Sequence, residues 1–242
     1  SKCLNFTWNG RKYSGFSGDT IASALAAAGV DVFSRGMKYH RRRGILSADH
    51  WDPNLLVQVE DEPNVRAGHR RLAEGMCVSA QNVWPSLRID LGSVNQIVGR
   101  FLSAGFYYKT FMRPKSLWPL YQKVLSRFAP GGRIHWETSS HGLYDKRYAQ
   151  PDVLVAGGGP AGMAAALAAA DAGATVMLVE HEYQLGGHLL WGGPGDRTAA
   201  ADLEASVRSH PNIETLVNST VTGRYDHNWV SVLDRSHSVA PE

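Results

Sequence analysis

The chain has 242 residues, of which 43% are hydrophobic, and 25 basic against 22 acidic side chains give a formal net charge of +3. This length allows one large domain or two modest ones, the composition excludes an intrinsically disordered chain, and the small net charge does not indicate a nucleic-acid partner. Two cysteines, Cys3 and Cys77, cannot form a disulfide framework. No run approaches the roughly 18 apolar residues of a spanning helix, and the first residues lack the pattern of a signal peptide. We therefore expect a soluble, cytoplasmic, globular protein.

Residues 1–65 have the pattern of a small β-grasp, ferredoxin-like module. Alternating apolar residues flank the pair Asn9-Gly10, which predicts a tight hairpin because both central positions of a type I′ turn need a positive φ. A helix is predicted next, with Asp19 as its N-cap and Gly29 as its stop. A strand over 55–59 completes the expected order of hairpin, helix and strand.

The stretch 66–149 is rich in aromatic residues, and four prolines interrupt any long helix. Only 116–128 has the pattern of a helix, with a proline near its start, where proline is tolerated. We interpret the stretch as an irregular connector whose aromatic side chains pack in a core shared by two domains. A ligand-lined cleft is the alternative.

The last part of the chain, 150–242, begins with a βαβ unit. The apolar run 153–156 indicates a buried parallel strand, a glycine-rich loop follows, and an alanine-rich helix is predicted over 163–171. Residues 175–179 predict the second strand. The pattern also predicts two later elements, a helix over 199–209 and a strand over 229–234.

Within this unit, Gly157, Gly159 and Gly162 satisfy the pattern G-x-G-x-x-G of dinucleotide-binding domains. The first glycine permits a tight turn, the second lets backbone amides approach a pyrophosphate, and the third lets the helix pack on the strand. The helix N-terminus directs free N–H groups at the phosphates. Glu180 follows the second strand, where its carboxylate accepts hydrogen bonds from an adenosine ribose and repels the 2′-phosphate of NADP. We therefore predict a site for NAD or FAD; the alternative is a glycine-rich turn that binds nothing.

Other candidate sites have weaker support. The basic run 38–43 contains an aromatic residue and invites a nucleic-acid interpretation, but a solvated face or an ion-paired contact between domains is favoured. The histidines lack the spacing of a zinc site, and no set of nucleophile and base can be assembled. We assign no catalytic residue and no metal ligand.

Several stretches carry a more specific pattern, and they cover essentially the whole chain: 18–20, 38–45, 62–67, 81–87, 104–112 and 157–162. Together they resemble the α subunit of heterotetrameric sarcosine oxidases, and 38–45 and 104–112 are specific to that family. Ala166 and the pair Gly186-Gly187 resemble the two-dinucleotide flavoprotein superfamily, in which a Gly-Gly turn lies close to the dinucleotide.

The resemblance implies an α/β chain, α+β overall, in which a β-grasp ferredoxin-like module precedes an incomplete Rossmann-like FAD/NAD(P)-binding domain of the two-dinucleotide flavoprotein type. The expected parts are the module at 1–65, the connector at 66–149, and the beginning of the dinucleotide-binding domain at 150–242.

Members of this family oxidatively demethylate sarcosine or related N-methyl amino acids. They pass the one-carbon unit to tetrahydrofolate or release formaldehyde, and oxygen is reduced to peroxide. The amine is oxidised on a β subunit that carries a flavin, while the α subunit holds NAD. The resemblance therefore implies NAD in this chain, with FAD as the alternative, and FAD and FMN in an assembled hetero-oligomer. It implies neither a membrane nor a nucleic-acid partner, and no iron–sulfur cluster is expected, because the C-x4-C-x2-C spacing is absent.

The motif and the resemblance together give the expected cofactor contacts. Val221 is the loosest of them, because no sharp motif surrounds it. The full set is Gly157, Gly158, Gly159, Pro160, Ala161, Gly162, Glu180, His181, Glu182, Gly186, Gly187, His188 and Val221.

The chain ends before the strand and loop that complete a dinucleotide-binding domain. We therefore expect an N-terminal piece of a longer subunit, as a split-gene product, a processed fragment or a truncated chain, whose partners are the missing C-terminal part and a flavin-bearing β-type subunit. Two other functions stay open. One is an FAD-binding subunit of an opine- or cyanide-forming type of dehydrogenase, and the other is a non-catalytic, structural dinucleotide-binding module.

Overall fold

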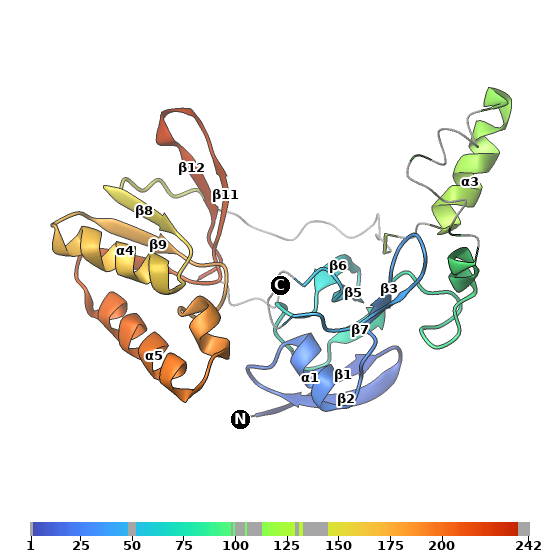
Figure 1. Ribbon diagram of the computed structural model, residues 1–242, viewed down its shortest axis with the longest axis horizontal. Helices are drawn as coiled ribbons and strands as arrows, with labels where there is room; N and C mark the ends of the chain where they lie inside the picture. Colours follow the sequence, from blue (N-terminus) through green and yellow to red (C-terminus); the bar gives the residue numbers. More distant parts are fainter. Residues whose placement is uncertain are drawn as a thin grey trace. The chain divides into compact units, whose positions relative to one another are not determined.

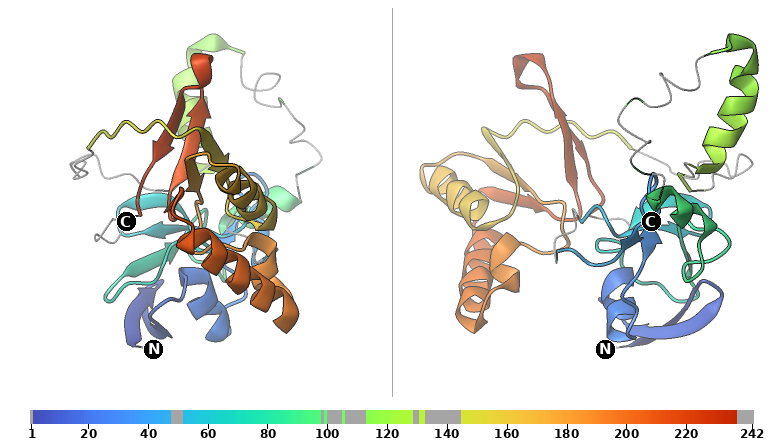
Figure 2. Two further views of the ribbon diagram at one scale, coloured as in Figure 1. Left: turned by 90° about the vertical axis from the view of Figure 1, so that its left-hand side faces the viewer. Right: turned by 45° about the vertical axis from the view of Figure 1, so that its right-hand side comes forward.

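The computed structural model describes residues 2–47, 52–97, 99, 105, 113–128, 131–132 and 145–236. It divides into two compact units, Ser1–His141 and Gly142–Glu242 (Figures 1 and 2). Apart from Gly105, the family-specific stretch 104–112 lies outside the described residues. Among the helices that are described, none is both long and apolar enough to cross a membrane.

The first unit is built on a five-stranded sheet with the order β2-β1-β7-β5-β6. β1 pairs in parallel with β7, and the other neighbours pair antiparallel. The turn between β1 and β2 has a positive φ at Asn9 (49°) and Gly10 (79°), which confirms the predicted hairpin. The strands are β1 (Cys3–Trp8), β2 (Arg11–Phe16), β5 (Leu56–Val59), β6 (Glu62–Arg66) and β7 (Cys77–Ala80), while β3 (Ser34–Arg35) and β4 (Arg42–Arg43) form a separate antiparallel pair.

The helix α1 (Ile21–Ala27) begins one residue later than the sequence predicts. Its N-cap is Thr20, whose hydroxyl accepts a hydrogen bond from the Ser23 N–H (3.1 Å), while the Ser23 hydroxyl accepts one from the Thr20 N–H (3.0 Å). This reciprocal pair satisfies two free amides of the first turn. The expected cap, Asp19, instead accepts hydrogen bonds from the Phe16 N–H and the Ser23 hydroxyl, both at 2.9 Å. Gly29, with φ of 80°, follows the helix as predicted.

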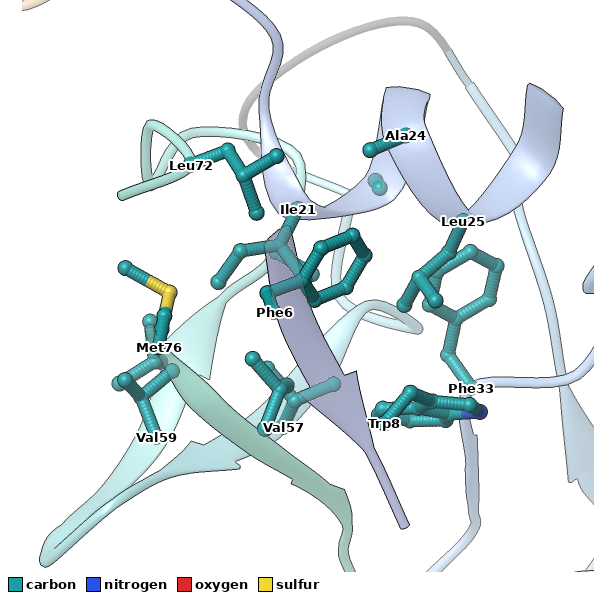
Figure 3. Close-up of a cluster of buried hydrophobic side chains, with 14 of the residues drawn as sticks. Phe6, Trp8, Ile21, Ala24, Leu25, Phe33, Val57, Val59, Leu72 and Met76 are labelled. Carbon is teal, nitrogen blue, oxygen red and sulfur yellow. The ribbon is translucent and has the colours of Figure 1, made fainter. Parts of the chain in front are cut away.

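The core of the first unit lies between α1 and the sheet (Figure 3). Phe6, Ile21, Leu25, Phe33 and Val57 are at most 2% exposed. Burial of such large apolar side chains is the main contribution to the stability of a domain of this size. The sheet depends on β7, which lies within the stretch 66–149 that the sequence pattern describes as a connector.

Beyond the sheet, the described residues of the first unit form further helical segments. The predicted helix at 116–128 is confirmed as α3 (Trp118–Phe128), and a short 3-10 turn, η3 (Lys115–Leu117), precedes it. Another 3-10 helix, η1 (Leu91–Gln96), follows a loop in which the Trp84–Pro85 peptide bond is cis.

The second unit contains a parallel three-stranded sheet with the order β10-β9-β8. This is the order 3-2-1 of the first half of a Rossmann-type domain. In Figure 1, α4 and α5 lie on the same side of this sheet. The elements are β8 (Val153–Ala156), α4 (Pro160–Asp171), β9 (Val176–Val179), the 3-10 helix η4 (Gly187–Trp191), α5 (Pro194–Ser209), β10 (Ile213–Leu216), β11 (Thr220–Arg224), η5 (Asp226–Asn228) and β12 (Val230–Leu233).

Alternating side chains of β9 pack on opposite faces of this sheet. Leu178 packs with Met163 of α4 on the helical face, whereas Val179 packs with Leu216 and with Val221 of the antiparallel β11–β12 hairpin. All four residues of β9 are buried. A strand covered on both faces is typical of a parallel sheet, and it explains the continuous apolar run in the sequence.

Both long helices of the second unit begin earlier than predicted. α4 begins at Pro160 rather than at residue 163, and α5 begins at Pro194 rather than at residue 199. In each case a glycine is the N-cap and a proline is the first helical residue, where its missing N–H costs nothing. The hydrophobic periodicity begins later than these caps, so the pattern placed the starts too late.

Candidate dinucleotide-binding site

The loop between β8 and α4 is a tight turn that glycine makes possible. Gly157 has φ of 109°, and its N–H donates to the carbonyl oxygen of Val179 (2.8 Å). A Cβ on Gly162 would clash directly with the carbonyl oxygen of Gly157. Both glycines are therefore needed for the close approach of the helix to the loop.

Gly159 has a different environment, because a Cβ built on it meets no heavy atom of the protein within 4 Å. It is the N-cap of α4, and its carbonyl oxygen accepts the hydrogen bond of the Met163 N–H (2.9 Å). The N–H groups of Ala161 and Gly162 belong to the first turn, where an α-helix offers no internal acceptor. The loop therefore presents backbone donors beside open space, as a pyrophosphate site requires.

Glu180, directly after β9, is 5% exposed and faces this loop. One of its carboxylate oxygens accepts a hydrogen bond from the Gly158 N–H, and the other accepts one from the Glu182 N–H (2.8 Å). The Nδ1 atom of His181 lies 3.1 Å from Glu180 Oε1. The residues 180–182 thus place two carboxylates and an imidazole at the carboxyl end of β9, where the ribose of a bound dinucleotide is held in this fold.

The Gly-Gly turn after β9 contacts the glycine-rich loop. The Gly186 N–H donates to the carbonyl oxygen of Gly158 (2.8 Å), and a Cβ on Gly187 would lie 2.9 Å from the Cα of Gly159. Gly186 has φ of 126°. A side chain on Gly187 would therefore push against the glycine-rich loop, whereas one on Gly186 would clash with Leu190.

The structure brings most of the predicted site residues together. The residues 157–162 and the pair Gly186-Gly187 are in direct contact, and Glu180 joins them through Gly158. His188 follows in η4, where its side chain is exposed. Val221 instead packs in the apolar cluster on the hairpin face of the sheet.

Sequence reasoning missed Leu185. Its side chain is fully buried and packs against Gly158 of the glycine-rich loop. An apolar residue directly before the Gly-Gly turn is the signal that could have found it. The site contains no evident nucleophile and base, and within the described ranges no three His, Cys, Asp or Glu side chains are grouped to hold a metal ion.

These features define a dinucleotide-binding domain of the flavoprotein type: a parallel strand, a glycine-rich loop, a helix, and an acidic residue at the end of the next strand. In agreement, residues 152–228 match the family model described as FAD dependent oxidoreductase. The first unit is ferredoxin-like, because residues 1–83 match the model of a 2Fe-2S iron-sulfur cluster binding domain. The chain thus joins a ferredoxin-like domain to an oxidoreductase domain, as the sequence resemblance implies.

Among characterised proteins, the chain is similar to subunit alpha of sarcosine oxidases. It is 45% identical over 242 residues to the subunit of Rhizobium meliloti (strain 1021), a match that covers 96% of this chain and 24% of that subunit. It is 30% identical over 241 residues to the subunit of Corynebacterium sp. (strain P-1), covering 97% of this chain and 21% of that subunit. The resemblance to the sarcosine oxidase α-subunit family is thereby confirmed. The chain spans between a fifth and a quarter of the length of these relatives.

A solved structure supports the fold. The L-proline dehydrogenase of P. horikoshii superposes with a TM-score of 0.58 at 18% identity, over 96% of this chain and 37% of the other. At this identity the similarity concerns the fold alone.

One cofactor prediction is wrong. We expected no iron–sulfur cluster, but the match of residues 1–83 to a 2Fe-2S cluster binding domain contradicts this and points to a cluster. A [2Fe–2S] cluster usually takes four Cys thiolates. The chain has only Cys3 and Cys77, both exposed, and the described residues offer no group of three potential ligands. These two cysteines alone do not fit the ligand set, so a cluster in this domain requires further ligands.

Proposed function

We propose that the second unit binds the adenosine diphosphate half of a dinucleotide. The contact of three segments at one point supports this proposal: Gly158 donates to Glu180 and accepts from Gly186. In this arrangement the N–H groups of the first turn of α4 hold the pyrophosphate, and Glu180 accepts hydrogen bonds from the ribose hydroxyls. The second carboxylate, Glu182, adds negative charge that disfavours a 2′-phosphate.

FAD is the dinucleotide that we propose, because the family model over residues 152–228 is that of an FAD-dependent oxidoreductase. NAD, which the sequence resemblance implied, is the ligand to compare. A flavin, when bound, supplies hydride and electron transfer chemistry. The residues of this site bind and orient the cofactor, and none of them is assigned a proton-transfer step.

For the whole protein, we propose a role as the dinucleotide-holding part of a sarcosine-oxidase-like complex. Its 45% identity to a sarcosine oxidase α subunit supports this role. In the complex, sarcosine or a related N-methyl amino acid is oxidatively demethylated, and the amine is oxidised at a flavin on a partner subunit. The one-carbon unit passes to folate, and this chain by itself does not catalyse the reaction. A cytoplasmic location agrees with two free cysteines.

The substitution Gly159→Val tests the cofactor site. Gly159 has φ of −70° and open space around its Cβ position, so valine is compatible with the fold, yet its side chain occupies the space expected for the pyrophosphate. We expect unchanged thermal unfolding and loss of FAD binding. Fluorescence titration of the 242-residue chain with FAD, and competition by NAD and ADP, measure this.

Gly193→Val is the matched control. Gly193 is the N-cap of α5, precedes Pro194, and has nearly the same backbone angles (φ −67°, ψ 178°) as Gly159 (φ −70°, ψ 176°). Its Cβ position is also nearly open. The control variant should bind FAD like the wild type. If Gly159→Val binds FAD as tightly as the wild type does, the site assignment is wrong. If NAD binds more tightly than FAD in the competition experiment, NAD is the favoured ligand.

A further inference from the structure

A pocket of about 580 Å³ in the first unit is lined by three arginines, Arg35, Arg42 and Arg88. A second cavity of about 370 Å³ shares Arg42 and Arg88 with it. The dinucleotide site does not use any of these residues. The pocket also explains part of the basic run 38–43, which the proposed function leaves without a role.

Two of the arginines face each other across a strand pair. Arg35 of β3 and Arg42 of β4 are direct partners in the antiparallel register. Side chains at such positions project from the same face and lie close together, and two like charges there are destabilising. The Asp90 carboxylate compensates part of the Arg35 charge, and a bound anion would remove the repulsion that remains.

Arg35 is held in place by the protein. It is 5% exposed, and its guanidinium donates to the carbonyl oxygens of His40 (2.9 Å) and Leu87 (3.0 and 3.2 Å). Its Nε atom lies 3.6 Å from the Asp90 carboxylate. The Arg35 guanidinium, which lines the pocket, is therefore fixed before any ligand binds.

The Asp90 carboxylate also lines the pocket, but its oxygens are already engaged. It lies 2.8 Å from His40 Nδ1 and accepts hydrogen bonds from the backbone N–H groups of Trp84 (2.9 Å) and Gly92 (3.3 Å). Counting the lining groups, three arginines and one aspartate leave two positive charges in excess. Ser93 and Gln96 add neutral hydrogen-bonding groups.

Within the described part of the chain, the side chains of Arg42 and Arg88 make no hydrogen bond or ion pair, although Asp31 lines the smaller cavity beside them. Other arginines of the chain are paired, such as Arg70 with Glu62 and Arg208 with Glu204. The guanidiniums of Arg42 and Arg88 each offer their own fork of N–H donors, which is the geometry that carboxylates and phosphates accept.

We propose that this arginine pocket binds a small oxyanion, a phosphate or carboxylate group, by forked hydrogen bonds from Arg35, Arg42 and Arg88. The site is independent of the dinucleotide site, since it lies in the other unit. Inorganic phosphate and succinate are suitable probes, because they present the two oxyanion classes separately.

The test is isothermal titration calorimetry of the 242-residue chain at low ionic strength with each probe. We expect saturable binding that Arg42→Gln/Arg88→Gln weakens by about tenfold or more for each arginine removed. The control Arg11→Gln removes one positive charge at an exposed position of β2, and this variant should bind like the wild type. Arg42→Lys, which keeps the charge without the fork, should bind with intermediate affinity.

Thermal unfolding provides a second measurement. Because the double variant lacks the repulsion across β3 and β4, it should be at least as stable as the wild type without anion, and phosphate should no longer raise its unfolding temperature. Tighter phosphate than succinate binding assigns the phosphate class, and the reverse assigns the carboxylate class.

Absence of saturable binding, or equal binding by the double variant, overturns the proposal. The Gly159→Val variant should retain the arginine-dependent binding. If the wild type binds the anion but does not bind FAD, the proposed function is wrong and the arginine-pocket proposal still stands.

Discussion

Glu180 has both a structural and a ligand-binding role, because its two carboxylate oxygens each accept a backbone N–H, from Gly158 and from Glu182. A buried carboxylate in this position fixes the glycine-rich loop and also offers its remaining lone pairs to a ribose. The sequence motif predicts the second role and not the first, since only the folded chain shows how close the loop lies to the strand end.

Glu180→Gln separates these roles. The amide keeps one acceptor but turns a donor toward the second backbone N–H, so that N–H loses its partner. We expect the free energy of unfolding to fall by about 1–3 kcal/mol, and FAD binding to weaken by about 1.5–3 kcal/mol, roughly 10- to 150-fold. Urea unfolding and FAD titration measure the two effects.

Glu182→Gln is the comparison variant, because Glu182 is partly exposed and lies 4.0 Å from His181 Nε2. We expect Glu182→Gln to change the free energy of unfolding and the FAD affinity less than Glu180→Gln does. If Glu180→Gln lowers stability but leaves FAD affinity unchanged, Glu180 supports the loop only and the ribose contact is wrong.

At the scale of elements, Asp152 and Thr175 connect the starts of β8 and β9. The Asp152 carboxylate accepts hydrogen bonds from the Thr175 hydroxyl (2.7 Å) and N–H (2.8 Å), and the hydroxyl accepts one from the Asp152 N–H (3.0 Å). The Thr175 hydroxyl and then its backbone N–H hold the pKa of Asp152 below its ordinary value of 3.8. Since the folded pKa lies below the unfolded one, this contribution to stability is present above the ordinary pKa and is lost as the pH falls through the lowered one.

Thr175→Val removes the hydroxyl hydrogen bond, which is the larger cause of the lowered pKa of Asp152, and keeps the hydrogen bond from the backbone N–H of residue 175. We expect the pKa of Asp152 to rise toward its ordinary value, measured by NMR titration of the carboxyl carbon. Glu74 is an internal control in the other unit, where the Asn5 backbone N–H (2.9 Å) lowers the pKa of Glu74. A pKa of Asp152 that stays unchanged in the variant would contradict the assigned cause.

The same scale shows how much of the fold the sequence could predict. The hairpin at Asn9-Gly10, α3 and the βαβ unit follow from local patterns, because turn residues and periodicity act over a few positions. β7 could not be found in this way, since it is only four residues long and its register with β1, Thr7 beside Cys77, joins residues far apart in the chain. The glycine-rich loop could be predicted because its motif is local. The contact of Gly186 with Gly158 and the cross-strand pairing of Arg35 with Arg42 could not, because they depend on tertiary structure.

At the scale of the whole molecule, each of the two units has its own buried core and its own proposed ligand. The first unit is built around Phe6 and Ile21, and the second around Met163 and Leu178. Units with separate cores unfold as separate cooperative transitions when few interactions couple them. The sequence predicts this division in outline, because the composition changes sharply near residue 150.

Differential scanning calorimetry of the full chain tests the division. We expect two unfolding transitions. FAD should raise the unfolding temperature of the second unit only, because it stabilises that unit by about 2.7 kcal/mol when free FAD is at 100 times its dissociation constant. Phosphate should raise only the transition of the first unit. Gly159→Val should abolish the FAD shift and keep the phosphate shift, while Arg42→Gln/Arg88→Gln should do the opposite. A single transition that FAD and phosphate both raise would mean that the units unfold as one cooperative body, so that ligand binding in one stabilises the other.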